Sequence, residues 1–171
     1  MKKEIPDSLK WLLFAEADYQ CAWCGCRKGL NPTIHHIRPR EHEGPTEYDN
    51  LVALCPDCHE LATKGDIAQK DVRRIKRHLV HRLFTPPGVN AAKIAYRHPQ
   101  GLVPVHPYVI QHLLDLGFFK HRQKVEGVEF GEPRVEVTLL ALYELTQSGR
   151  AIVEKWLLRT DDMDEPGLCN L

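Results

Sequence analysis

The chain has 171 residues, of which 43% are hydrophobic and 27% charged, so it has the composition of one or two small globular domains. Its 23 basic and 23 acidic residues give a formal net charge of zero, which excludes nucleic-acid binding by bulk charge and leaves only a local basic patch. Apolar runs fall short of the ~20 residues of a membrane span, and the first residues lack a signal-peptide pattern, so we expect a cytoplasmic protein without membrane contact.

A short amphipathic helix is predicted over residues 7–18, capped by Asp7 or Ser8. Its apolar face is expected to comprise Trp11, Leu12, Phe14 and Ala15. The next segment, residues 19–64, is rich in Cys, His, Pro and Gly and lacks long periodic runs. Because such a segment buries little apolar surface, we expect a metal ion to hold it together.

The cysteines are concentrated in this segment, since five of the six lie between residues 21 and 58. In a reducing compartment such a set indicates metal binding or catalysis rather than disulfides. Two CxxC knuckles each place two thiolates on one side of a tight turn, and together they predict a structural zinc site. Its four ligands would be Cys21, Cys24, Cys55 and Cys58. Cys26 is then a spare thiol, and Cys169 stands alone in the tail.

A capping box at residues 66–69 predicts a second helix that runs to about residue 84. Apolar residues recur along it at helical spacing: Val72, Ile75, Leu79 and Leu83. Its exposed face is expected to carry six basic residues: Lys70, Arg73, Arg74, Lys76, Arg77 and Arg82. Such a run is typical of a solvated helix face, and equally of a face that contacts DNA phosphates.

Pro86-Pro87-Gly88 is expected to end this helix and to open a Pro- and Gly-rich linker, residues 86–106, between two domains. The second domain, residues 107–160, is predicted to be a small α+β accessory unit. It would comprise a helix over 107–117, a hairpin within 125–145 that turns around 131–133, and a helix over 146–158 with Ile152, Trp156 and Leu157 in its core. Residues 161–171 are expected to be an acidic tail.

Three histidines lie beside the cysteine knuckles. His35 and His36 are adjacent, and His59 follows the second knuckle directly. Adjacent side chains of a strand point to opposite faces, so this pair is not expected to serve a single purpose. Because four thiolates already complete the zinc site, the three histidines predict a second, open metal site. A lone histidine would more often be a satisfied core or surface residue, but a cluster favours an active site.

Together these segments resemble the HNH endonucleases, the ββα-metal nucleases. The pattern is a CxxC knuckle, a pair ending in His followed by Ile-x-Pro, then Asn-Leu, then Leu-Cys-x-x-Cys-His, in this order within about residues 10–80. The resemblance implies an α+β fold: a zinc-stabilised, treble-clef-like ββα-metal nuclease module in residues 1–85, followed by the small α+β domain.

The resemblance also implies roles for single residues. His36 matches the general base that activates water, His35 the first metal ligand, and His59 the ligand at the start of the helix. Asn50 matches the central Asn that holds the loop and orients the base. Thr63 stands where some members have a further ligand. Because Thr is a weaker ligand than His or Asn, we expect the metal to rely also on water and on the scissile phosphate.

Phosphodiester hydrolysis fits these residue types. A neutral histidine, with an ordinary pKa of ~6.5, can take the proton of a water molecule near neutral pH. A divalent cation can stabilise the charge on the phosphate and on the leaving 3′ oxygen. Two histidines and water suit Mg, Mn, Ni or Zn without choosing among them. Candidate phosphate contacts are Arg38, Arg40 and Lys64.

The sequence thus predicts a metal-dependent endonuclease with double-stranded DNA as its substrate. Two alternatives stay open. One is a zinc module that binds nucleic acid or protein with weak or no cleavage, which Thr63 favours; the other is an enzyme that acts on RNA or structured DNA. The oligomeric state is not indicated.

The second half resembles a winged-helix domain in its order of motifs. A helix ends at Gly117, a hairpin follows as the wing, and Leu145-Thr146-Gln147-Ser148-Gly149 opens the last helix. The resemblance implies a unit that positions DNA or a protein partner. The alternative is an appendage that only stabilises the chain.

Overall fold

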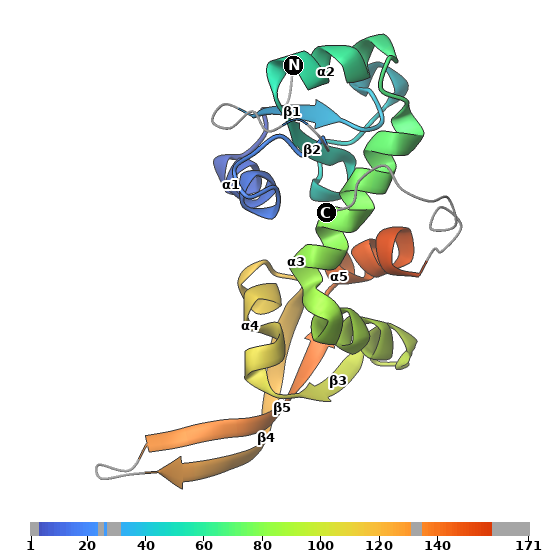
Figure 1. The fold of residues 1–171 in the computed structure, drawn as a ribbon. Coiled ribbons are helices and arrows are strands. Elements are labelled where there is room, and N and C mark those ends of the chain that lie inside the picture. Colours follow the sequence, from blue (N-terminus) through green and yellow to red (C-terminus); the bar gives the residue numbers. More distant parts are fainter. Residues whose placement is uncertain (1–3, 24–25, 27–31, 131–134, 159–171) are drawn as a thin grey trace. The chain divides into compact units, whose positions relative to one another are not determined.

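The computed structural model describes residues 4–23, 26, 32–130 and 135–158, and it is an α+β structure (Figure 1). The chain divides into two compact units with the boundary between Leu83 and Phe84. Among the described residues, no helix combines the length and the apolar character that crossing a membrane requires. Each unit is described by itself below.

The first unit contains a two-stranded antiparallel sheet followed by a helix. Strand β1 (Thr33–His36) pairs with β2 (Leu51–Leu54), and the register sets His36 opposite Leu51. Helix α2 (Pro56–Lys64) follows β2 after one residue. All four residues of β2 are buried, so this strand anchors both neighbours to the core of the unit.

Helix α1 (Asp7–Glu16) lies where the sequence predicts it, but it presents a different face to the core. Leu13 is completely buried, whereas Trp11 is 62% exposed. The reason is an ion pair on the inner side of the helix. The carboxylate of Glu16 accepts hydrogen bonds from Lys76 Nζ at 2.5 Å and from the Tyr48 hydroxyl at 2.6 Å. Hydrophobic periodicity could not reveal this face, because a charged residue forms part of it.

The basic run on α3 (Gln69–Arg97) is only partly exposed. Lys76 and Arg77 are buried, which contradicts their predicted place on a solvated face. Arg82 donates a hydrogen bond to the Glu16 carbonyl oxygen at 2.6 Å and pairs with Asp18 at 3.0 Å. Long basic side chains can therefore be buried in the core when they pair with an acidic residue from a distant segment.

The predicted capping box at the start of α3 does not form. The helix begins at Gln69 rather than directly after Asp66. The side-chain amide of Gln69 donates to the carbonyl oxygen of Ile37 at 2.6 Å, so it ties α3 to the end of β1. A tertiary hydrogen bond has replaced the local one that the motif predicts.

The predicted linker at residues 86–106 is instead folded. Helical backbone continues to Arg97 and breaks only at Thr85, whose φ is +59° and ψ 156°. A residue before proline is driven out of the α region, while Pro86 fits the first turn of the helix that restarts there. Strand β3 (Leu102–Val105) then occupies the rest of the expected linker.

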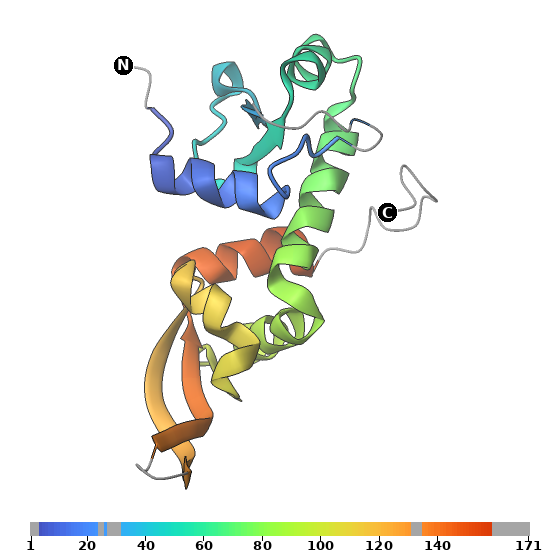
Figure 2. The ribbon, with the colours of Figure 1, turned by 60° about the vertical axis from the view of Figure 1, so that its left-hand side comes forward.

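The second unit combines a three-stranded antiparallel sheet with helices. Helix α4 (Pro107–Asp115) precedes β4 (Phe119–Phe130) and β5 (Val135–Leu145), and the strand order is β3-β5-β4. The long β4–β5 hairpin and the helices around it are seen from two sides in Figures 1 and 2. The predicted hairpin is confirmed, although β4 begins six residues earlier than expected, and its turn lies outside the described residues.

The last helix begins as the sequence predicts. Helix α5 (Gln147–Ile152) continues as a π-helical turn, Val153–Leu157, and its three predicted core residues are buried: Ile152, Trp156 and Leu157. Thr146 caps the helix by accepting a hydrogen bond from the Gly149 amide at 3.1 Å. A side chain at Gly149 would collide with the carbonyl oxygen of Phe118, which explains the glycine. The predicted acidic tail lies outside the described residues.

Candidate active site and metal centre

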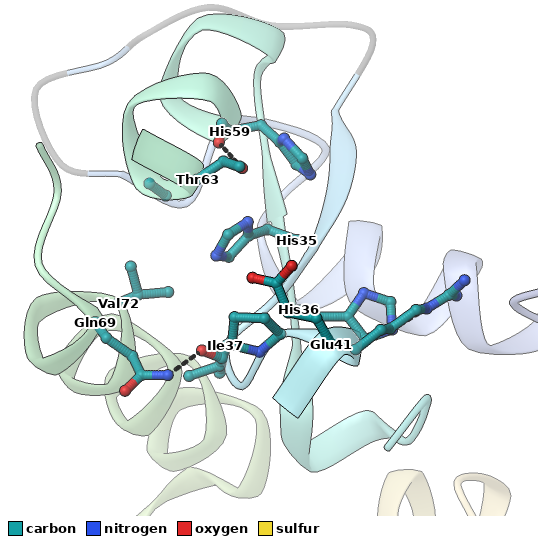
Figure 3. A pocket seen from close by; sticks show the side chains of 11 residues that line it. His35, His36, Ile37, Glu41, His59, Thr63, Gln69 and Val72 are labelled. Atoms are coloured by element: carbon teal, nitrogen blue, oxygen red, sulfur yellow. Dashed lines mark hydrogen bonds between the residues drawn. The ribbon is translucent and has the colours of Figure 1, made fainter. Parts of the chain in front are cut away.

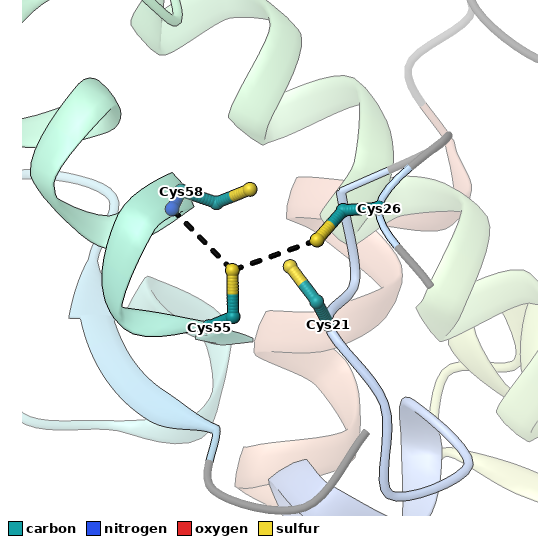
Figure 4. A group of neighbouring side chains, drawn as sticks. All are labelled: Cys21, Cys26, Cys55 and Cys58. Carbon is teal, nitrogen blue, oxygen red and sulfur yellow. Dashed lines mark hydrogen bonds between the residues drawn. The ribbon is translucent and has the colours of Figure 1, made fainter. Parts of the chain in front are cut away.

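Four cysteines form one cluster in the first unit (Figure 4). The sulfur atoms of Cys21, Cys26, Cys55 and Cys58 all lie within 4.8 Å of one another. Four thiolates that bind one zinc at ~2.3 Å in tetrahedral geometry would have their sulfur atoms about 3.8 Å apart. The cluster therefore has the donor set and nearly the spacing of a structural zinc site, and a small contraction would complete it.

Helix α2 builds half of this cluster. Cys55 is its N-cap, and the Cys55 sulfur accepts a hydrogen bond from the Cys58 amide at 3.4 Å. Pro56 begins the helix, where its missing N–H costs nothing. Because the helix N-terminus presents amide groups and positive dipole to the sulfur, this position suits a thiolate.

The thiol pKa values show why a cation is needed. Burial raises the pKa of Cys21 to about 11, and burial together with the neighbouring thiols raises that of Cys58. The pKa of Cys55 is lowered despite its burial, because the Cys58 amide and the neighbouring thiols donate to it. Without a metal the Cys21 and Cys58 thiols are thus protonated near neutral pH, and a zinc ion would bind by displacing these protons.

Cys26, predicted to be a spare thiol, lies in the cluster among the described residues. Its sulfur lies 3.5 Å from that of Cys55. The Cys26 amide donates to the Trp23 carbonyl oxygen, and the Ala22 amide donates to Ala53, so this segment is held alongside β2. Counting residues within CxxC did not predict that Cys26 lies among these thiols. Cys24, the predicted ligand, lies outside the described residues.

The three histidines line one cavity of about 320 Å³ (Figure 3). His35 and His36 come from β1 and His59 from α2. The ring centroids of His35 and His59 are 5.0 Å apart, with the ring planes at 86°. His36 is the last residue of β1, where the chain turns, and it reaches the same cavity as His35 although adjacent strand residues ordinarily diverge.

Both imidazoles of β1 are held in their neutral form. Burial, together with the neighbouring His59 and His36, lowers the pKa of His35 to about 4. Burial also lowers the pKa of His36, helped by the Arg40 guanidinium. A neutral imidazole has a lone pair, which both a metal ligand and a general base require.

Asn50 closes the loop between the two strands. It is 3% exposed, and its side-chain oxygen accepts a hydrogen bond from the Arg38 amide at 2.9 Å. Its side-chain nitrogen donates to the carbonyl oxygens of Arg38 and Pro45 at 3.0 and 2.9 Å. The Ile37 amide donates to the Asn50 carbonyl oxygen. The amide thus fixes the backbone directly after His36.

The three candidate phosphate contacts differ in their surroundings. Arg40 lines the histidine cavity. Arg38 instead donates to the carbonyl oxygen of His42 at 2.6 Å, and Lys64 pairs with Glu60 at 2.5 Å on the outside of α2. The structure therefore brings one of the three to the histidines.

Thr63 lines the cavity one turn after His59, and its hydroxyl donates to the His59 carbonyl oxygen at 2.8 Å. Sequence reasoning missed two further lining residues, Glu41 and Gln69. Figure 3 shows the Glu41 carboxylate directed toward His35. Glu41 belongs to no motif, and the capping box that contains Gln69 gives no reason to place it at a site, so only the folded structure identifies them.

Comparison with known proteins agrees with this geometry. Residues 21–65 match the family model for HNH endonuclease, and this range contains β1, β2, α2, the cysteine cluster and the three histidines. A search of curated proteins finds no match to the chain. Residues 21–65 are therefore similar to the HNH endonuclease domain, a family whose members are typically nucleases.

Proposed function

We propose that the protein is a metal-dependent endonuclease that hydrolyses DNA phosphodiester bonds. His36 acts as the general base, and His35 and His59 hold a divalent cation. The observation that carries this proposal is the gathering of three imidazoles around one cavity within the family-matched segment. The lowered pKa values of His35 and His36 support it, because both rings are then neutral at the pH at which a nuclease works.

The ring spacing fits a shared cation. For metal–nitrogen bonds of ~2.0–2.1 Å, the centroids of two imidazoles on one metal lie roughly 5 Å apart. The 5.0 Å between His35 and His59 matches this value. Glu41 adds a carboxylate on the same cavity wall, a hard ligand that favours Mg or Mn over softer metals.

Each residue then has a distinct task. His36 takes the proton of the attacking water, and Asn50 holds the backbone that carries His36. Arg40 binds a non-bridging phosphate oxygen. The cation, when bound, stabilises the negative charge that develops on the phosphate and on the leaving 3′ oxygen. Lys70 and Arg73 are exposed near the start of α3 and supply further phosphate contacts.

Cleavage of supercoiled plasmid tests this proposal. Purified zinc-loaded protein is assayed with Mg, Mn or Ni, beside a reaction quenched with chelator. His36→Ala should abolish nicking and leave the zinc content and melting temperature unchanged. His42→Ala is the matched control, because this exposed histidine lies on the same loop outside the cavity wall.

Failure has a defined meaning. If folded, zinc-loaded protein cleaves DNA with none of these metals, the nuclease proposal is refuted. A gel-shift assay with the same DNA would then test the alternative of a zinc module that binds without cutting.

A further inference from the structure

Arg40 makes a contact with the proposed base that its role as a phosphate contact does not require. Its Nε donates a hydrogen bond to His36 Nε2 at 3.0 Å. The Thr46 hydroxyl lies 3.2 Å from the same imidazole nitrogen. Two polar side chains of one loop thus converge on one nitrogen of His36.

The direction of the first hydrogen bond determines the tautomer of His36. A guanidinium group has donors and no acceptor, so His36 Nε2 must accept and cannot carry a proton. In a neutral imidazole the proton is then on Nδ1. Thr46 must also act as the donor toward Nε2, which a hydroxyl can do by rotation.

The same contact occupies the lone pair that general-base catalysis needs. In the DNA-free protein Arg40 donates to the atom that would take the proton of water. Arg40 is exposed and lines the cavity, so its side chain can leave His36 without disturbing the core. A phosphate is an anion and can accept two parallel hydrogen bonds from a guanidinium, whereas the neutral imidazole accepts one, so an arriving phosphate competes well for Arg40.

We propose that Arg40 is a positioning residue that keeps His36 in its Nδ1–H tautomer and covers the Nε2 lone pair until a DNA phosphate takes over the guanidinium. This inference rests on the proposed function. Once Arg40 has moved, Nε2 accepts a proton from water. The water oxygen forms a bond to phosphorus, and the bond from phosphorus to the 3′ oxygen breaks with its electron pair on that oxygen. Substrate binding thereby exposes the base.

Nitrogen-15 NMR of the imidazole rings in zinc-loaded, full-length protein tests the tautomer directly. The signals of His36 are assigned by their loss in His36→Ala. In the wild type we expect a protonated Nδ1 and an unprotonated Nε2. Arg40→Gln should move the population toward the Nε2–H form, which free imidazole side chains prefer. Arg38→Gln removes the same charge from the same loop without touching His36 and should leave the tautomer unchanged. A protonated Nε2 in the wild type would overturn the inference.

The second arm follows the displacement of Arg40. A short DNA duplex is added without divalent cations, so that it binds uncleaved. The Arg40 Nε–H signal should shift on binding. The chemical shift of His36 Nε2 should move toward that of an imidazole nitrogen that accepts no hydrogen bond from Arg40. In steady-state cleavage, Arg40→Gln should raise KM, because the phosphate loses its guanidinium partner. An Arg40 Nε–H signal that stays unchanged when DNA binds would refute the displacement.

The two proposals fail separately. Wild-type protein that cleaves no DNA refutes the nuclease proposal, whatever the tautomer. Wild-type protein that cleaves DNA while its His36 Nε2 is protonated refutes only the role of Arg40.

Discussion

Replacing Lys76 with methionine should strongly destabilise the first unit. The Lys76 and Glu16 side chains are both 0% exposed, and their Nζ and Oε1 atoms are 2.5 Å apart. The ammonium group also lies 3.6 Å from the centroid of the Tyr48 ring. In Lys76→Met the carboxylate of Glu16 stays buried with no cation beside it. Removing one partner of a buried pair costs about 3–5 kcal/mol, which is a large part of the ~5–15 kcal/mol of a whole domain.

Urea unfolding of the zinc-loaded chain measures this cost. The matched control is the triple variant Glu16→Met, Tyr48→Phe and Lys76→Met, which removes the ion pair and the hydroxyl that donates to it. Since apolar groups of similar volume can replace a buried ion pair with little loss, we expect the triple variant to be much closer to wild type. A Lys76→Met variant within about 1 kcal/mol of wild type would refute the reasoning, because Glu16 would then not be a buried, paired anion.

The pH dependence gives an independent check. Burial raises the pKa of Glu16 while Lys76 opposes the rise, so removal of Lys76 should raise this pKa further. A carboxyl whose folded-state pKa exceeds its unfolded value destabilises the fold at high pH. The difference in the free energy of unfolding between Lys76→Met and wild type should therefore shrink as the pH falls from above the raised pKa of Glu16 toward the pKa of Glu16 in the unfolded chain. A difference that is constant with pH would contradict this assignment.

Three further variants test the metal sites and the loop. Cys26→Ser should weaken zinc binding at least about tenfold in competition with a chelator, whereas Cys169→Ser should not. If both variants bind zinc equally well, Cys26 is a spare thiol. Asn50→Ala should lower the free energy of unfolding by about 1–3 kcal/mol, because it leaves buried backbone groups of the loop unpaired; an unchanged urea midpoint would contradict its structural role. Thr63→His should increase Mn affinity in calorimetry, because the new imidazole would stand one turn after His59 on the cavity wall; lower affinity would count against the proposed cation site.

Local patterns in the sequence were sufficient for much of the fold. The cysteine and histidine motifs predicted the segment that matches the HNH endonuclease family, because a metal site needs specific ligand types at short spacings. The hairpin, helix α4, which ends two residues before the predicted stop at Gly117, and the buried Ile152, Trp156 and Leu157 followed from turn residues and periodicity. In each case the residue types that signal the element lie within a few residues of one another.

Only the tertiary structure decided the remaining features, since they depend on partners far apart in the chain. Lys76 looked exposed because its partner, Glu16, lies 60 residues away. Cys26 joins the thiol cluster because backbone hydrogen bonds hold its segment beside β2. The contact of Arg40 with His36 is local, but it forms within a loop whose backbone Asn50 holds through Arg38 and Pro45. Residue types and spacings reveal which chemistry a segment can support, whereas burial and long-range contacts determine which side chains are in place to perform it.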